Sequence, residues 1–362
     1  MNSSQADGAI DIRRATGDDL DAAQFLLSQR DGWEWDGSSV TWFLCDMDPN
    51  RCLVWLAWEG QRPVGLSCVF VRSLVHGGGT FRTAYWANLY IDPQYRHLML
   101  YPRLPLAMLR DLQQDGFDFL YGCIRLRDLA RAHLGLGFAK VGQIDVLIKP
   151  LRPARLLVKR GHWPRSMNVV SPLVDAVYHG VQSCYRSRRD SRFEVREVDL
   201  DSPVIKDMVC LFNNAGGDQL RQCWTEDSLR YRYAQTREGG QYHVLAAQSG
   251  PQPIAVLIYR IAERDRIRTA VVMGIGFAPD GQRGARTVLA QMQRRAYQAG
   301  CEAILYLDGQ DADTRHVFQA MGYRQSSQVY DMLVWPRRVV EGGTVQMGAD
   351  HWQFTFGDHD AF

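Results

Sequence analysis

The sequence predicts an α/β protein of the α+β kind, made of two tandem copies of one domain, each a mixed, mostly antiparallel twisted sheet flanked by helices. The main observation is an internal repeat. An apolar strand, a Gly-containing turn and a second apolar strand occur at 55–65 and again at 245–255. Two later segments also recur, 90–93 as 276–279 and 136–138 as 321–323. The offset falls from 190 to 186 and 185 residues, which indicates loops of different length on a shared scaffold.

Length and composition fit this organisation. A chain of 362 residues with 46% hydrophobic residues can bury one core in each of two domains. The chain has 42 Lys and Arg against 40 Asp and Glu, so it is nearly neutral. This balance argues against a nucleic-acid-binding protein, which would carry a strong excess of basic residues. No apolar run reaches the roughly 20 residues that span a bilayer, and the N-terminus has no secretory signal pattern. The eight cysteines form no C-x-x-C pair, so we expect free thiols and a cytoplasmic location.

Hydrophobic spacing and turn residues predict the elements of the first copy. Leu20, Ala23, Leu26 and Leu27 recur at helical spacing and predict a helix over 18–29. Glycines at 60 and 77–79 predict two hairpin turns. The remaining predictions are strands at 10–13, 82–91, 117–123 and 141–148, a helix at 102–114, and a short helix ending at 135 or 137.

The second copy repeats this order and closes its sheet with its own last strand. Its predicted strands are 195–198, 243–247, 254–261, 268–276, 303–308 and 328–335, and its helices are 203–213, 286–298 and 314–320. The predicted domains are therefore residues 1–150 and 193–336, with a linker at 151–192 and a C-terminal tail at 337–362. Asp358, His359 and Asp360 in the tail could suggest a metal, but we expect a strand or hook instead.

The segment 149–192 between the copies is strongly basic. It holds ten basic residues and only two acidic ones, Asp175 and Asp190. Residues 172–185 predict an amphipathic helix with Leu173, Val177 and Val181 near one face. The simplest interpretation is a solvated connector that packs its apolar stripe on both domains. The alternatives are a docking site for an acidic partner, such as an acyl carrier protein, or for an anionic membrane surface.

The order β-α-β-β-β-α-β-α-β, with a Gly-aromatic pair before the last strand, resembles the GNAT (Gcn5-related N-acetyltransferase) superfamily, here as a tandem-domain acyltransferase. The stretch 91–101, IDPQYRHLMLY, stands where the family has a strand, a Pro and Arg/Gln-x-x-Gly-x-Gly/Ala before a helix. Arg96 keeps the basic position, but Met99 and Tyr101 replace the glycines. In the second copy, Gln282-x-x-Ala285-x-Thr287 matches the pattern better.

The resemblance implies acetyl-CoA or another acyl-CoA as co-substrate, and no metal. Unpaired N–H groups at a helix N-terminus can cradle the pyrophosphate of coenzyme A. We expect the first copy to be the donor site. The predicted cofactor contacts are Leu89, Ile91, Arg96, His97, Leu98, Met99, Leu100 and Tyr101 in the first copy, and Gln282, Arg283, Gly284 and Ala285 in the second.

The resemblance also suggests catalytic residues. His133 lies four residues before Gly137, where the family often has a Tyr that protonates the leaving thiolate, and Phe318 fills this place in the second copy. His133 is therefore the candidate general acid; the alternative is a surface histidine without a role. Asp308 at the end of a strand is a candidate base, although we favour an N-cap.

Three further positions are predicted to meet the acceptor. Asn88 and Tyr90 alternate along the central strand and should face the cleft together with Trp86. They would position the acceptor or a water, or else belong to the core. Trp33 and Trp35 follow the first helix and are candidates for a substrate wall, with core packing as the alternative.

The predicted function is transfer of an acetyl or longer acyl group from coenzyme A to an amine of a small molecule or sugar. One alternative is a FemX-like transferase that takes an aminoacyl group from a charged tRNA, with the basic linker contacting RNA. Another is an acyltransferase or a non-catalytic adaptor that uses an acyl carrier protein.

Overall fold

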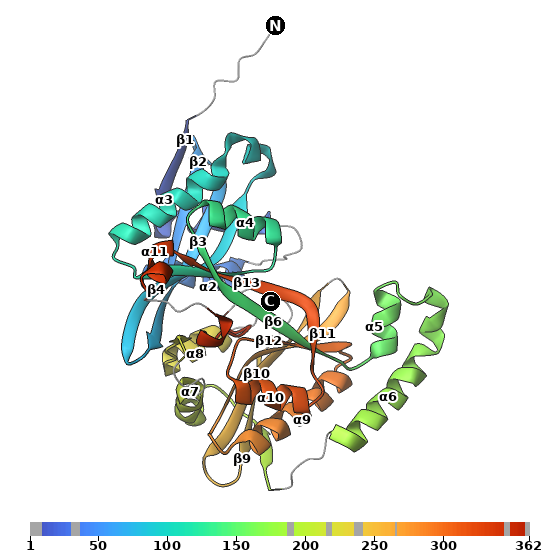
Figure 1. The fold of residues 1–362 in the computed structure, drawn as a ribbon. Helices are drawn as coiled ribbons and strands as arrows, with labels where there is room; N and C mark the ends of the chain where they lie inside the picture. The colour runs from blue at the N-terminus through green and yellow to red at the C-terminus, as the bar shows by residue number, and fades with distance from the viewer. Residues whose placement is uncertain are drawn as a thin grey trace. The chain divides into compact units, whose positions relative to one another are not determined.

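The computed structural model describes residues 9–29, 37–186, 192–214, 219–234, 242–264, 266–343 and 348–358. The chain forms two compact units. The first contains residues 1–142 and 331–347, and the second contains 143–330 and 348–362. The chain passes from one unit to the other within β6 (Ala139–Pro150) and again within β13 (Arg324–Trp335) (Figure 1). Trp33 and Trp35 lie outside the described residues, so their predicted role as a substrate wall stays a prediction.

The first unit has one mixed sheet in the order β1-β2-β3-β4-β5-β13. Neighbouring strands are antiparallel except β4 and β5, which are parallel. Its own strands are β1 (Ile10–Arg14), β2 (Cys52–Glu59), β3 (Arg62–His76), β4 (Gly79–Ile91) and β5 (Phe119–Ile124). Its helices are η1 (Gly17–Asp19), α1 (Leu20–Ser28), α2 (Gly37–Phe43), η2 (Cys45–Met47), η3 (Pro93–Leu98), α3 (Leu100–Gln114), α4 (Arg127–Gly135) and α11 (Arg337–Glu341).

The second unit repeats the same sheet in the order β7-β9-β10-β11-β12-β6. Again only one neighbouring pair, β11 and β12, is parallel. Its strands are β7 (Glu194–Glu197), β8 (Arg221–Gln222), β9 (Tyr242–Gln248), β10 (Pro253–Arg264), β11 (Ile267–Phe277) and β12 (Ala303–Asp308). Its helices are α5 (Pro153–Lys159), η4 (Arg165–Val169), α6 (Ser171–Arg186), α7 (Val204–Asn214), α8 (Glu226–Tyr233), α9 (Gln282–Gln298), α10 (Ala312–Ala320) and η5 (Ala349–His351).

The last strand of each sheet comes from the other half of the chain. Residues 331–335 of β13 pair with β5, and residues 145–150 of β6 pair with β12. The prediction that each half closes its own sheet is therefore wrong. The two edges are equivalent strands of the two copies, and the apolar pattern of a closing strand does not say which of them it joins. The predicted domain boundaries at residues 150 and 193 stay a prediction. Each compact unit nevertheless includes strand residues from the other side of these boundaries, 331–335 in the first unit and 143–150 in the second.

Helices cover both faces of the second sheet. The apolar face of α9 packs through Val288, Leu289 and Met292 into a cluster that includes Ile275 of β11. The neighbouring residues of β11 point to the opposite face, where Gly274 and Gly276 make room for α7. A Cβ on Gly276 would lie 3.0 Å from the backbone carbon of Leu211, so α7 approaches the strand closely because the glycine has no side chain.

In the first unit, α3 and α4 lie over one face of the strands (Figure 1). Leu104, Met108 and Leu109 of α3 pack against Trp55, Val69 and Trp86 of the sheet. The indole N–H of Trp55 donates to Asp111 at 2.8 Å, which orients a fully buried ring. This core sets the position of the strand pair β4 and β5 on which the candidate site is built.

Candidate active site

Each sheet has a β-bulge at the same place on its fourth strand. On β4, Trp86 pairs with Val69 and Asn88 pairs with Cys68, which leaves Ala87 without a partner. On β11, Val272 pairs with Tyr259 and Gly274 with Ile258, which leaves Met273 without one. Ala87 and Met273 are separated by 186 residues, the same offset as 90–93 and 276–279. A bulge leaves the extra residue's backbone groups outside the ladder and bends the strand.

The bulge lies where the fourth and fifth strands part. The parallel pairing of β4 with β5 covers only Thr83–Tyr85 against Phe119–Tyr121. In the second unit, β11 pairs with β12 only from Thr269 to Val272. Beyond these points each fourth strand continues without its parallel neighbour. Backbone N–H groups exposed in such a splay can polarise a carbonyl that enters it, as in an oxyanion hole.

The bulge also changes which side chains share a face of β4. Residues paired across a sheet share a face, and Cys68 and Val69 are consecutive on β3 and therefore point to opposite faces. Trp86 thus lies on the opposite face from Asn88. Asn88 and Tyr90 do share a face, since their partners Cys68 and Leu66 are two residues apart on β3. The prediction that Trp86 lies on that face is wrong, because the extra residue at the bulge breaks the two-residue alternation.

His133 lies in an aromatic cluster on the α3 and α4 side of the splay. Its ring centroid is 4.2 Å from that of Trp86 and 5.2 Å from that of Phe138. The Tyr101 hydroxyl, from the start of α3, lies 3.2 Å from its Nδ1. His133 is 4% exposed, so it is not a surface histidine. Side chains of α3 and α4 therefore meet over Trp86, the residue before the bulge.

The protonation state of His133 follows from its contacts. Its Nδ1 is 2.7 Å from the carbonyl oxygen of Leu129, which can only accept, so Nδ1 carries the proton and Nε2 carries the lone pair. Burial lowers the pKa of His133 to about 4, and burial also raises the pKa of Tyr101 to about 12. Both groups are therefore neutral near pH 7. In this state His133 can accept a proton at Nε2 before it donates one.

The predicted cofactor loop of the first copy is a tight 3-10 turn. Asp92 caps it by accepting from the N–H of Gln94, and Arg96 and His97 are exposed. Met99 has φ 54° and ψ 33°, the left-handed conformation that glycine adopts most easily. Met99 thus has the backbone conformation that suits a glycine, the residue that the family pattern has at this position.

Helix α3 presents few backbone donors at its start. Tyr101 is non-helical (φ −88°, ψ 91°), so the regular helix begins at Pro102. Pro102 and Pro105 have no N–H group. Leu100 is fully buried and Leu98 packs in a small core cluster, so neither side chain lines an open cup. An anion at this helix end would depend on the exposed side chains of Arg96 and His97 more than on N–H groups.

The second copy keeps a better helix N-terminus. Gly281 accepts from Ala285 at 2.9 Å, so the N–H groups of Gln282, Arg283 and Gly284 precede the first helical bond. Both glycines here also have a packing role. A Cβ on Gly281 would lie 2.6 Å from the Ile254 carbonyl oxygen, and one on Gly284 would lie 2.6 Å from the Ile254 Cδ1.

The splay of the second copy is filled by main-chain atoms and one amide side chain. The N–H of Gly357 donates to the carbonyl of Met273, the bulged residue, at 2.7 Å. The amide of Gln310 donates to the carbonyl of Ile275 at 3.0 Å. Phe354 bridges to Gly309, just after β12. The expected C-terminal hook is confirmed for the described residues 348–358, and His359 and Asp360 lie outside them.

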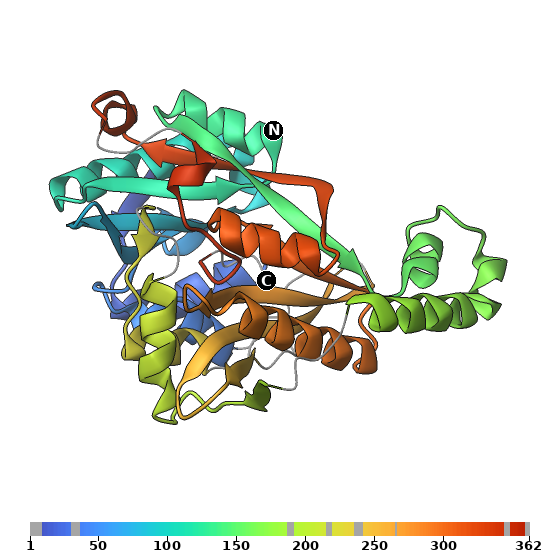
Figure 2. The same cartoon turned by 60° about the horizontal axis from the view of Figure 1, so that its bottom comes forward.

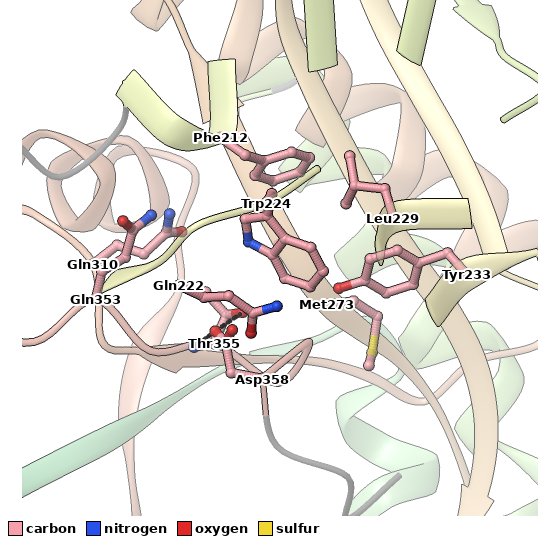
Figure 3. A pocket seen from close by; sticks show the side chains of 11 residues that line it. Phe212, Gln222, Trp224, Leu229, Tyr233, Met273, Gln310, Gln353, Thr355 and Asp358 are labelled. Atoms are coloured by element: carbon pink, nitrogen blue, oxygen red, sulfur yellow. Dashed lines mark hydrogen bonds between the residues drawn. The ribbon is translucent and has the colours of Figure 1, made fainter. Parts of the chain in front are cut away.

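A small pocket, with room for little more than a water molecule, lies beside the second bulge (Figure 3). One side is apolar and aromatic, and Trp224 and Tyr233 approach with ring centroids 5.9 Å apart. The other side is polar and includes Thr355 and Asp358, whose hydroxyl and carboxylate are 2.9 Å apart. The amide oxygen of Gln222 is buried without a hydrogen-bond partner among the described residues. The pocket can accept a hydrogen bond from a small N–H or O–H group.

Sequence reasoning missed most of this pocket. Its residues come from α7, β8, α8, β11 and the tail, which are far apart in the sequence. The sequence singles out only Asp358, as part of a possible metal site, and among the described residues no group of three or more His, Cys, Asp or Glu is placed to hold a metal. Asp308 also differs from its expected capping role. It pairs with Arg315 at 2.8 Å, while Asp311 caps α10.

Comparison with solved structures identifies the fold. The chain is similar to a GCN5-related N-acetyltransferase from Anabaena variabilis, with a TM-score of 0.60, 11% identity, and coverage of 90% of this chain and 72% of that one. It is also similar to Saccharomyces cerevisiae N-myristoyltransferase with bound myristoyl-CoA, with a TM-score of 0.61, 12% identity, and coverage of 91% and 79%. A GCN5-related N-acetyltransferase from Kribbella flavida matches with a TM-score of 0.55 and 14% identity, over 90% of this chain and 71% of that one.

These comparisons show that the chain has the GNAT fold. No protein-family model matches the sequence, and no curated protein sequence matches it either. None of the described helices is long and apolar enough to cross a membrane. At identities of 11–14% the likeness shows the fold alone, so the activity has to be argued from the site.

Replacing the buried ring in His133→Gln should change how stability depends on pH. The pKa of His133 is about 4 in the folded protein against 6.5 as its ordinary value, so between these values the unfolded chain binds more protons. Its contribution to the free energy of unfolding therefore falls by about 3 kcal/mol as the pH falls through this window. Urea unfolding at several pH values should show a flatter dependence in the variant. The exposed His162 gives the control His162→Gln; equal pH dependence in all three proteins would contradict the burial argument.

Gly357→Ala should loosen the tail from the second splay. A Cβ at this position would overlap the Tyr233 hydroxyl and lie 2.6 Å from the carbonyl oxygen of Met273. We expect the free energy of unfolding to fall by about 1–3 kcal/mol, measured by urea titration. Gly180→Ala on α6 is the matched control because open space surrounds its Cβ, and it should be neutral or stabilising. An unchanged stability in Gly357→Ala would show that the tail is not held there.

Proposed function

We propose that this protein is an acyl-CoA-dependent N-acyltransferase that moves an acetyl or longer acyl group to an amine of a small molecule or sugar. The observation that carries the proposal is the bulged, splayed strand pair, which occurs at matched positions in both sheets of a GNAT fold. One protein of similar fold is an N-myristoyltransferase with bound myristoyl-CoA, and others are N-acetyltransferases.

We propose that the first copy binds the donor. The second splay is occupied by backbone atoms of Gly357 and by Gln310, which are held by hydrogen bonds to β11. The first is closed by side chains, and the contact between Tyr101 and His133 is a single 3.2 Å approach. A side-chain rotation takes far less rearrangement than removal of a bridged tail. Arg96 and His97 are the proposed partners of the diphosphate.

The proposed chemistry uses the neutral state of His133. The amine nitrogen attacks the thioester carbonyl carbon, a C–N bond forms, and the C–S bond breaks with the electron pair leaving on sulfur. Nε2 of His133 takes the proton that the amine loses and returns it to the thiolate. The predicted general acid is thus first a base: a pKa of about 4 in the free protein keeps the imidazole neutral and able to accept a proton, although it makes His133 a weak base and, once protonated, a strong acid toward the thiolate. The bulged backbone at Ala87 would polarise the carbonyl.

Two exposed arginines test which copy binds the donor. Arg96 and Arg283 lie in the two corresponding loops, Arg283 at the place that His97 holds in the first, and both are exposed, so replacing either should leave the fold intact. We expect acetyl-CoA or a longer acyl-CoA to raise the melting temperature by mass action. Arg96→Ala should weaken binding about tenfold by loss of a charge-assisted contact, and Arg283→Ala less than about twofold. Isothermal titration with each variant gives the dissociation constants.

Each outcome has a separate meaning. A larger loss in Arg283→Ala would place the donor in the second copy. No thermal shift with any acyl-CoA would contradict the proposed function, and retention on charged tRNA would then favour an aminoacyl transferase.

His133→Ala tests the proton-transfer step. If His133 carries the proton, turnover should fall about 10²–10³-fold, while the dissociation constant of the acyl-CoA changes little. His133→Gln should be as slow, since an amide cannot accept the proton at neutral pH. Turnover is followed by release of free thiol from acyl-CoA with a panel of amines. Unchanged turnover in both variants would remove His133 from the mechanism.

A further inference from the structure

Helix α6 presents its apolar side to solvent, the reverse of a helix that packs on a core. Six of the ten exposed large hydrophobic side chains of the described residues lie on η4 and α6, and they are Val169, Val170, Leu173, Val174, Val177 and Val181. Leu173, Val177 and Val181 recur every four residues and are 70%, 61% and 51% exposed. The expected packing of this stripe on both domains is therefore wrong.

Polar contacts fix this orientation. Asp175, on the other side of α6, is 1% exposed and accepts from the N–H groups of Ala154 and Arg155 at the start of α5. His179 stacks on Tyr297 of α9 with ring centroids 3.6 Å apart. Turning the apolar stripe inward would carry Asp175 away from α5 and leave the N–H groups of Ala154 and Arg155 without their acceptor. The exposure of the stripe is therefore built into the packing of the second unit.

The charge of the same segment is almost entirely positive. Residues 155–189 contain seven basic residues, and their one acidic residue is the buried Asp175. Lys159 pairs with Glu302, while Arg160 is exposed beside the α5–η4 loop. That loop also carries Trp163, which is half-buried. Figure 2 shows α5 and α6 projecting away from the strands of the second unit.

We propose that the surface formed by η4 and α6 binds an anionic lipid surface, with α6 lying in the plane of the headgroups. An amphipathic helix with an apolar stripe, basic flanks and a nearby Trp has the composition of an interfacial helix. Branched apolar side chains insert below the headgroups, and the exposed Arg160 meets lipid phosphates. A second copy of this chain would cover the stripe as well, but it would bring the same positive charge. An acidic protein partner would match the basic residues, but it predicts no binding to lipid vesicles, which the following test measures.

Vesicle flotation tests the proposal without reference to catalysis. The full chain should float with vesicles of phosphatidylcholine containing about 30% phosphatidylglycerol and remain unbound with phosphatidylcholine alone. Raising the salt concentration should weaken binding, since exposed charges are screened. The double variant Leu173→Asp/Val177→Asp should reduce binding at least about tenfold, because it places two charges in the apolar stripe. Both positions are exposed, so the fold should not change.

The control is Leu106→Asp on α3, a position 49% exposed and outside the stripe, which should bind vesicles as the unchanged protein does. Arg160→Glu should weaken binding to anionic vesicles several-fold without changing the oligomeric state. Absence of flotation with anionic vesicles, or equal flotation of the double variant, would overturn the proposal. So would sedimentation velocity showing a dimer that the double variant alone dissolves, because a second copy would then be the occupant.

Discussion

The β-bulge on the fourth strand of each sheet is the feature on which the rest of the site depends. One extra residue, Ala87 in the first copy and Met273 in the second, bends the strand just where its parallel neighbour ends. The bend exposes backbone groups, and it decides which side chains face the helices. Trp86 faces α3 and α4 by regular alternation with Ala84 and meets His133 there, while the bulge places Asn88 and Tyr90 on the other face. The chemistry proposed for the first copy requires both the backbone and the imidazole at this point.

The two copies retain different features of the same site, namely the helix N-terminus and the splay. The second copy has the better helix N-terminus, with Gly281 and Gly284 before and within its first turn, but its splay is filled by Gly357 and Gln310. The first copy has a splay closed by side chains alone, but two prolines remove donors from its helix. The left-handed backbone at Met99 retains the shape of a glycine loop without the glycine. Such a division is expected when duplication relieves one copy of its original task.

The sequence predicted the elements well because each has a local cause. Gly60 makes a turn, Asp92 and Pro93 end a strand, and apolar spacing marks α1, α6 and α9. It could not predict the exchanged strands, since β6 and β13 meet equivalent edges. Nor could it place Trp86, because no local signal marks the bulge. Its spacing of four residues before Gly137 predicts His133 as a site residue. The burial of His133 and its hydrogen bond to the Leu129 carbonyl depend on packing that only the folded chain provides.

The exchanged strands bear on why both halves persist. The sheet of the first half ends on residues 331–335, and that of the second ends on 145–150. A gene fragment that encoded either half alone would lose the strand that the other half supplies, and its own closing strand, β6 or β13, would have to pair with its own sheet or leave that edge unpaired. Deleting a half that lost its catalytic task would therefore remove a strand from the sheet of its sister. For this reason, the cofactor loop of one copy can lose its sequence pattern while the chain keeps both halves.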